Sequence, residues 1–170
     1  MVDMSTTKYS KYILKEPLEK YKWSPSIHVC AHEKCVGAIF PEFPVDLALM
    51  YIKEPFVMEA KPHVHDVDEL LFVFGGNPAN FFEFDAELEL YMGEEGEKNI
   101  IDTTAIVYIP KGLVHCPLNI KRVGKPFLFG HIVLAERYSK IVDGVKEFHD
   151  HEQLHKRYSP EEARNMRKGF

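Results

Sequence analysis

Two histidines and a glutamate fall on alternate positions of one short segment near the middle of the chain. Residues 63–69 read HVHDVDE and run directly into the apolar and aromatic stretch that ends at Phe74. Successive side chains of a β-strand point to opposite faces, so His63, His65 and Glu69 would share one face of a strand. Imidazole nitrogens and a carboxylate oxygen are suitable ligands for a first-row divalent metal. The segment therefore predicts a strand that presents three metal ligands, with a further ligand elsewhere.

His115 is the candidate for that further ligand. It follows a turn signalled by Pro110 and Gly112, with apolar residues on both sides of the turn. A histidine in this place is held rigidly at the start of a strand. The sequence thus offers four donors in two separate segments.

These two segments resemble the two motifs of the cupins, HxHx(3,4)Ex(6)G and PxGx(2)Hx(3)N. The matching residues are His63, His65, Glu69 and Gly76 in the first motif, and Pro110, Gly112, His115 and Asn119 in the second. Val57 and Thr104 depart from the pattern, because the family often has glycine there. The resemblance implies an all-β protein, a cupin-type antiparallel β-barrel (jelly roll), with one metal ion held by His63, His65, Glu69 and His115.

The rest of the pattern agrees with many short strands. Residues 82–92 alternate apolar and acidic side chains, which predicts a strand over that range. At 170 residues the chain is about one domain long, and we expect a single domain. Its expected parts are an N-terminal extension over residues 1–42, a core barrel over about 43–135 and a helical tail over 136–170. Within the tail, a capping pattern at residues 159–162 predicts a short helix to about Lys168.

Composition excludes several classes of function. The formal net charge is −5 and there is no basic stripe or helix-turn-helix pattern, so we expect no nucleic-acid partner. No apolar run approaches the ~20 residues that span a bilayer, so we expect no membrane association. The N-terminus lacks an apolar signal region, which makes a cytoplasmic location the default. Three cysteines do not form a disulfide framework.

Four protein ligands leave two or three coordination positions open, as in a catalytic rather than a structural site. Fe, Mn, Ni, Zn or Co would all suit the donors. Iron would favour a dioxygenase, whereas the other metals would favour Lewis-acid work by an isomerase or lyase. The leading hypothesis is therefore a metal-dependent enzyme acting on a small organic molecule. The alternative is a cupin that binds or senses a small ligand with a metal but without turnover, because a fold does not fix a function.

A general acid or base should lie beside such a metal. Glu59 and Lys61 share parity with His63, and Tyr51 and Tyr91 are further candidates. His131 stands in an apolar run and is either a partner of the metal ligands or a satisfied core residue. The apolar residues expected inside the barrel favour a substrate with an aliphatic or aromatic part.

Other clusters have simpler interpretations. Two histidine-containing groups are interpreted as ordinary strand, loop or surface residues rather than metal sites: His28, Cys30, His32 and Cys35, and His149, His151 and His155. Cys116 is interpreted as a small core residue that faces away from the metal. The resemblance also implies a homodimer, for which the N-terminal segment with Tyr12, Tyr21 and Trp23 could supply a contact.

Overall fold

The structure is a computed structural model of the whole chain. It describes residues 8–13, 19–21, 27–30, 44–80, 82–135, 138–148 and 155–157, together with residues 161, 164, 165 and 168. Apart from a 3-10 turn, η1 at Ser10–Tyr12, the elements with defined bounds are strands. They are β1 (Glu19–Tyr21), β2 (Ile27–Cys30), β3 (Asp46–Ile52), β4 (Phe56–Glu59), β5 (Glu69–Gly75), β6 (Ala86–Met92), β7 (Glu97–Ile101), β8 (Ala105–Ile109), β9 (His115–Val123), β10 (Phe127–Val133), β11 (Ser139–Val142), β12 (Val145–Phe148) and β13 (His155–Arg157).

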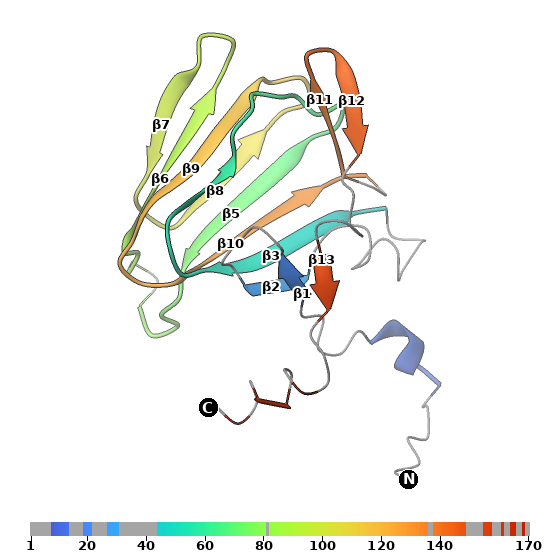
Figure 1. Cartoon of the computed structure of the whole chain (residues 1–170), viewed down its shortest axis with the longest axis vertical. Helices are drawn as coiled ribbons and strands as arrows, with labels where there is room; N and C mark the ends of the chain where they lie inside the picture. The colour runs from blue at the N-terminus through green and yellow to red at the C-terminus, as the bar shows by residue number, and fades with distance from the viewer. Residues whose placement is uncertain are drawn as a thin grey trace.

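The strands form two main antiparallel sheets. One sheet has the order β13-β1-β2-β3-β10-β5-β8, and the other has the order β4-β9-β6-β7. Strands β11 and β12 make a separate hairpin beside them (Figure 1). The predicted all-β jelly roll is confirmed. The predicted C-terminal helix lies mostly outside the described residues and stays a prediction.

The core lies between the two sheets. Because side chains alternate along each strand, every second residue points into it. The β3 pattern shows this, with Ala48 and Ile52 fully buried while Tyr51 between them is exposed. Both sheets contribute buried apolar residues, among them Met50, Leu71, Val73, Phe127 and Phe129 from one and Ala86, Leu88, Leu90, Leu118 and Ile120 from the other. This core positions β3, β5, β9 and β10, which carry the residues of interest.

Three short strands extend the larger sheet beyond the expected barrel limits of about 43–135. Strand β2 pairs with β3, β1 pairs with β2, and β13 pairs with β1. Parts of the expected N-terminal extension and C-terminal tail thus belong to the same sheet. The division into extension, barrel and tail stays a prediction.

The strand predicted over residues 82–92 begins later than expected, at Ala86. Turn bonds hold the preceding residues out of the sheet, since the Glu83 amide donates to the Asn80 carbonyl at 3.1 Å. The Phe82 amide donates to the Asn80 side chain, also at 3.1 Å. Phe82 is consequently 94% exposed rather than part of the apolar strand face.

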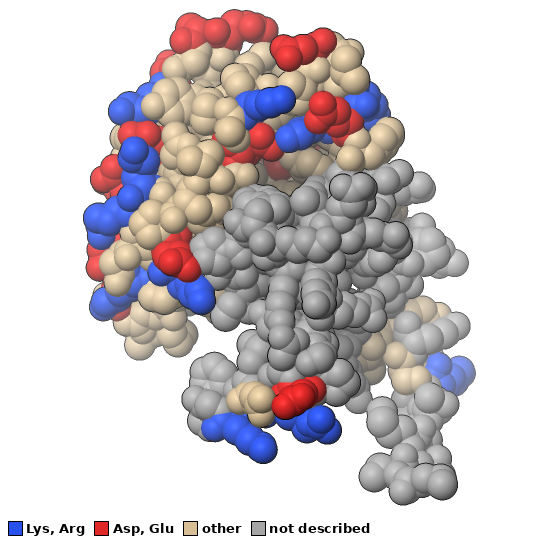
Figure 2. Space-filling view, viewed as in Figure 1, with Lys and Arg blue, Asp and Glu red and all other residues tan. Residues whose placement is uncertain are grey.

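Two observations concern the surface. Among the described residues, no helix is long and apolar enough to cross a bilayer. On the face in Figure 2, the acidic and basic side chains of the described residues are interspersed.

Candidate metal centre

The segment that carries the first two histidines is a loop with single bridges, and the predicted continuous strand over residues 63–69 is wrong. His63 forms an isolated bridge with His115, and Val64 forms one with Ile141. Strand β5 begins only at Glu69. Asp68 binds the turn of the other motif segment instead, because the Lys111 amide donates to Asp68 Oδ1 at 2.8 Å.

His115 is the first residue of β9, directly after the predicted turn. Gly112 adopts a φ of 80°, a left-handed conformation that glycine tolerates best, and the Leu113 amide bonds the Pro110 carbonyl at 3.0 Å. The backbones of His63 and His115 exchange two hydrogen bonds of 3.0 Å, and the Gly112 amide donates to the His65 carbonyl at 2.9 Å. The two motif segments are therefore joined through their backbones.

These contacts bring three imidazole rings together in the interior. One ring nitrogen from each of His63, His65 and His115 lies within 4.8 Å of those of the other two. The ring centroids are 4.9, 4.3 and 5.0 Å apart. All three residues are buried, at 4%, 2% and 2% exposure.

The Nδ1 atom of each ring contacts a backbone carbonyl, which fixes the orientation of the ring. The Nδ1 atoms of His63, His65 and His115 lie 3.0, 2.7 and 3.0 Å from the carbonyls of Lys61, Ser139 and Leu113. A carbonyl only accepts, so Nδ1 carries the hydrogen and Nε2 of the neutral ring keeps a lone pair. Among the described residues, Nε2 of His63 and Nε2 of His65 are buried without a hydrogen-bond partner. Buried polar atoms of this kind call for a partner, and an arrangement of bound Nδ1 with free Nε2 is typical of metal-ligating histidines.

Glu69 completes the group. Its Oε2 lies 3.4 Å from His65 Nε2 and 3.5 Å from His115 Nε2. The side chain is almost fully buried, at 3% exposure. The structure thus assembles the four residues of the sequence hypothesis, three imidazoles and one carboxylate, from both sheets and the connecting loop.

The electrostatics follow from this crowding. Burial, together with the neighbouring imidazole of His115, lowers the pKa of His63 to about 4. Burial opposes ionisation of His65 and Glu69 too, but their mutual attraction outweighs it. The pKa of His65 is raised, and that of the Glu69 carboxyl lies well below its usual range. Glu69 is therefore a carboxylate at neutral pH and His63 a neutral imidazole, the forms that bind metals.

A second layer of side chains lies behind Glu69. His131 Nδ1 is 3.6 Å from Glu69 Oε1, and its Nε2 is 3.2 Å from Oδ1 of the buried Asp46. The Tyr138 ring stacks on His131 with centroids 5.2 Å apart at 9°, and meets the His65 ring edge-on, also at 5.2 Å. Burial raises the pKa of the Tyr138 phenol well above its ordinary value, so this group stays neutral. His131 is buried and contacts both Asp46 and the expected metal ligand Glu69, so these contacts fit both of its interpretations.

The structure places the other acid–base candidates at the edge of the cluster or on the surface. Tyr51 lies on the outward side of β3, since Met50 and Ile52 beside it are buried, and Tyr91 alternates with the buried residue Leu90 on β6. Lys61 is exposed and contributes only its carbonyl to His63. Glu59 Oε2 lies 2.5 Å from Lys140 Nζ of the hairpin, although the charge of Glu59 also acts on His63.

The remaining predicted groups have simple outcomes. Cys116 is buried in the core cluster, as expected, and burial raises the pKa of its thiol. The side chains of the two other histidine groups lie outside the described residues, so their interpretation stays a prediction. Sequence reasoning missed Asp46, Tyr138 and the Ser139 carbonyl. Asp46 did carry a signal, since it is an acid with the same parity as the inward residues Ala48, Met50 and Ile52.

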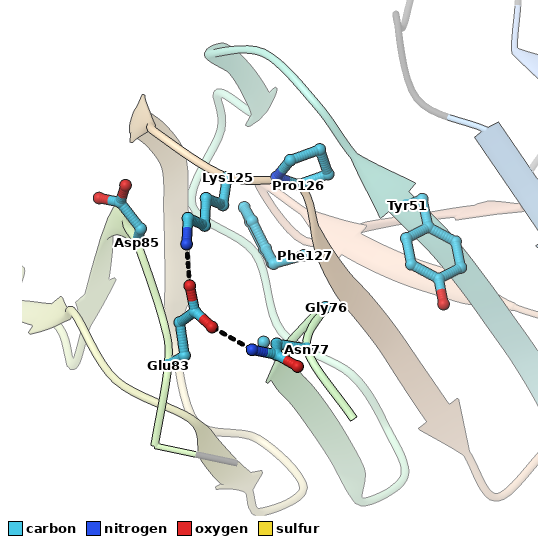
Figure 3. Close-up of a pocket in the computed structure, with 9 residues that line it drawn as sticks. Tyr51, Gly76, Asn77, Glu83, Asp85, Lys125, Pro126 and Phe127 are labelled. Carbon is cyan, nitrogen blue, oxygen red and sulfur yellow. Dashed lines mark hydrogen bonds and ion pairs between the residues drawn. The ribbon is translucent and has the colours of Figure 1, made fainter. Parts of the chain in front are cut away.

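A surface cavity of about 370 Å³ lies at the opposite end of β5 from the cluster. It is lined by the β5 end at Gly75 and by Tyr51 and Phe127, with Glu83 and Lys125 at one side. Glu83 binds both Lys125 and Asn77 (Figure 3). The cavity is thus separate from the histidines, and its charged groups already bind one another.

Fold and site together define a jelly roll with a histidine–carboxylate cluster between its sheets. No protein-family model and no curated protein matches the sequence. Among solved structures, oxalate oxidase in complex with the substrate analogue glycolate matches with a TM-score of 0.52 and 13% identity, over 82% of this chain and 67% of that one. The protein has the cupin fold.

Two further structures match smaller parts. A cupin superfamily protein from Desulfitobacterium hafniense has a TM-score of 0.38 and 14% identity, over 54% of this chain and 68% of that one. Cobalt(II) HppE in complex with Tris buffer has a TM-score of 0.38 and 13% identity, over 53% of this chain and 45% of that one. The chain thus spans less than half of the length of HppE.

Proposed function

We propose that this protein is a metal-dependent enzyme that acts on a small organic molecule, as a dioxygenase or as a Lewis-acid isomerase or lyase. His63, His65, Glu69 and His115 would hold one divalent ion of Fe, Mn, Ni, Zn or Co. The observation that carries the proposal is the set of three buried imidazoles, each fixed through Nδ1 to a backbone carbonyl, with Nε2 of His63 and of His65 buried without a hydrogen-bond partner among the described residues.

The residues present fit such an ion. Three neutral imidazoles and one carboxylate give a net single negative charge, which a divalent cation more than balances. When bound, the ion would supply Lewis acidity at a substrate oxygen or, if it is iron, electron transfer with O₂. Glu69 would orient toward the ion, and the structure adds the neutral Tyr138 phenol, whose ring lies beside His65, to the acid–base candidates.

Metal content of the protein tests this proposal. Protein purified without chelator or affinity nickel should contain about one metal ion per chain by elemental analysis. The double variant His63→Ala/His65→Ala should contain none, because it removes two of the three imidazoles. Val64→Ala, which lies between them, is the matched control and should retain the metal. Full occupancy in the double variant would refute the assigned ligands.

A cupin that binds or senses a small ligand without turnover is the second candidate. The observation that favours it is burial, because all four expected ligands are no more than 4% exposed. Turnover separates the two. The metal-loaded protein should convert at least one member of a panel of small organic acids and of molecules with an aliphatic or aromatic part. Oxalate oxidase binds the small acid glycolate on the same fold, which justifies including acids. Ligand-induced thermal stabilisation without product formation would support the binding protein instead.

A further inference from the structure

Two buried carboxylates lie on either side of one imidazole behind the candidate metal centre. Glu69, His131 and Asp46 are 3%, 8% and 1% exposed. We propose that His131, held in place by Asp46, is a positioning residue that fixes the Glu69 carboxylate for metal binding. This inference rests on the proposed function, since it assigns a role toward the same metal.

The two oxygens of Glu69 have different neighbours. Oε2 faces His65 and His115, whereas Oε1 lies 3.6 Å from His131 Nδ1. If the Nε2 lone pairs of the three site histidines serve a metal, those rings have no N–H left for Glu69. His131 is then the imidazole that still faces Glu69. A buried carboxylate without polar neighbours is costly, so this contact both stabilises Glu69 and directs Oε2 toward the histidines.

His131 is itself restrained on two further sides. Its Nε2 lies 3.2 Å from Asp46 Oδ1, and its ring stacks on Tyr138. Asp46 and His131 come from the paired strands β3 and β10, where His131 is opposite Ala48 and Asp46 is opposite Val133. Both side chains point inward, which places the acid diagonally beside the ring. The sheet register, rather than a flexible loop, therefore sets the position of the imidazole.

A purely structural role does not account for Asp46. A histidine that only filled the core would need no carboxylate buried to 1% exposure beside it, because a buried charge is costly unless it is paired. The order carboxylate, imidazole, carboxylate instead resembles the outer hydrogen-bonding groups that orient metal ligands elsewhere. Loss of such a group typically weakens metal affinity by about 10–100-fold.

Cobalt(II) is a suitable probe, because its visible absorption reports the number and geometry of its ligands independently of activity. His131→Phe should weaken Co(II) affinity by about 10–100-fold and change the visible bands, since Glu69 is no longer directed. His131→Gln keeps an amide donor and should restore most of the affinity and the spectrum. Asp46→Asn should change both measurements in the direction of His131→Phe, but less.

Phe129→Leu is the matched packing control. Phe129 is an inward core residue on the same strand and is 2% exposed. This variant should lower the unfolding temperature while leaving Co(II) affinity and spectrum unchanged. Equal effects of Phe129→Leu and His131→Phe on Co(II) would overturn the inference, since general packing would then explain both.

The outcomes separate the inference from the proposed function. If the wild-type chain binds no Co(II), the proposed function fails. If the wild type binds Co(II) but His131→Phe has the same affinity and spectrum, only the positioning role fails. Should His131→Phe not fold, Asp46→Asn decides, and unchanged Co(II) binding in that variant overturns the inference.

Discussion

Single imidazoles at the candidate metal centre are prepared for ligation by backbone atoms rather than by other side chains. The carbonyls of Lys61, Leu113 and Ser139 select the same tautomer in all three rings. Burial also disfavours protonation of His63, whose pKa is lowered to about 4.

The pKa of His63 predicts a pH dependence of stability for the metal-free protein. Between pH 4.5 and 6.5 the unfolded chain binds a proton at His63 that the folded chain does not, so stability falls as the pH is lowered. The raised pKa of His65 acts only at higher pH, and the lowered pKa of Glu69 acts only at lower pH. We expect His63 to contribute a slope of up to about 1.4 kcal/mol per pH unit.

Urea unfolding at several pH values measures this slope. His63→Gln should flatten it in that window, and Val64→Ala should keep it. A slope that is the same in His63→Gln and in the wild type would contradict the assignment.

At the scale of elements, the β11–β12 hairpin is tied to the loop that carries His63 and His65. Val64 and Ile141 exchange backbone hydrogen bonds of 3.1 and 2.8 Å, and Ser139 accepts from His65. Two ion pairs hold the hairpin further: Lys140 pairs with Glu59 at the end of β4 at 2.5 Å, and Lys146 pairs with Asp66 of the loop at 2.7 Å. The hairpin therefore holds one ring of the candidate metal centre directly, through the Ser139 carbonyl.

Loosening this hairpin should loosen the centre. Lys140→Met removes the less exposed ion pair, whose side chains are 23% and 26% exposed. We expect faster amide hydrogen exchange at Val64 and Ile141, and faster metal loss to a chelator, by the equivalent of about 1 kcal/mol or less. Lys146→Met removes the pair with 43% exposure on both sides and serves as the control with a smaller effect. An equal or larger effect of Lys146→Met would contradict this order.

The sequence identified the elements well where alternation is unbroken. It predicted the apolar inward face of β6, and it placed His115 correctly after its turn. It failed at residues 66–68, where Asp68 binds a backbone amide of the other motif segment and interrupts the expected strand. Such a bond joins residues 43 positions apart and leaves no local pattern.

The supporting residues were hidden for the same reason. The partner of His65 is a carbonyl 74 residues away, and a carbonyl has no signature in the sequence. His131 and Asp46 are 85 residues apart and meet only through the pairing of β3 with β10. The candidate ligands could be predicted from motif spacing, whereas the groups that orient them required the register of the sheet.

At the scale of the whole molecule, the outer face of the larger sheet is unusually apolar beside its β8 edge. Leu70, Ile106 and Tyr108 are 36%, 61% and 56% exposed, and Leu70 pairs directly with Tyr108. Exposed apolar patches mark interaction surfaces in many proteins. The expected homodimer would bury this face, because an uncharged patch can pair with its own copy.

Light scattering during size-exclusion chromatography tests this expectation. The wild type should elute as a dimer at micromolar concentration, and Ile106→Glu/Tyr108→Glu should elute as a monomer. Ile100→Glu alters a residue of the other sheet that is 47% exposed and should leave the dimer intact. A monomeric wild type would contradict the expected homodimer. A double variant that remains dimeric would show that this face is not the dimer interface.

The histidine cluster and the surface cavity occupy opposite ends of β5, whose seven residues separate them by roughly 20 Å. A fluorophore attached at the exposed residue Ala79, in the turn beyond Gly75, would sit within energy-transfer range of a coloured ion such as cobalt(II) or copper(II). Quenching of its emission would report metal loading in real time. The length of β5 thereby sets the distance between the label and the ion, and the labelled turn contains none of the candidate ligands.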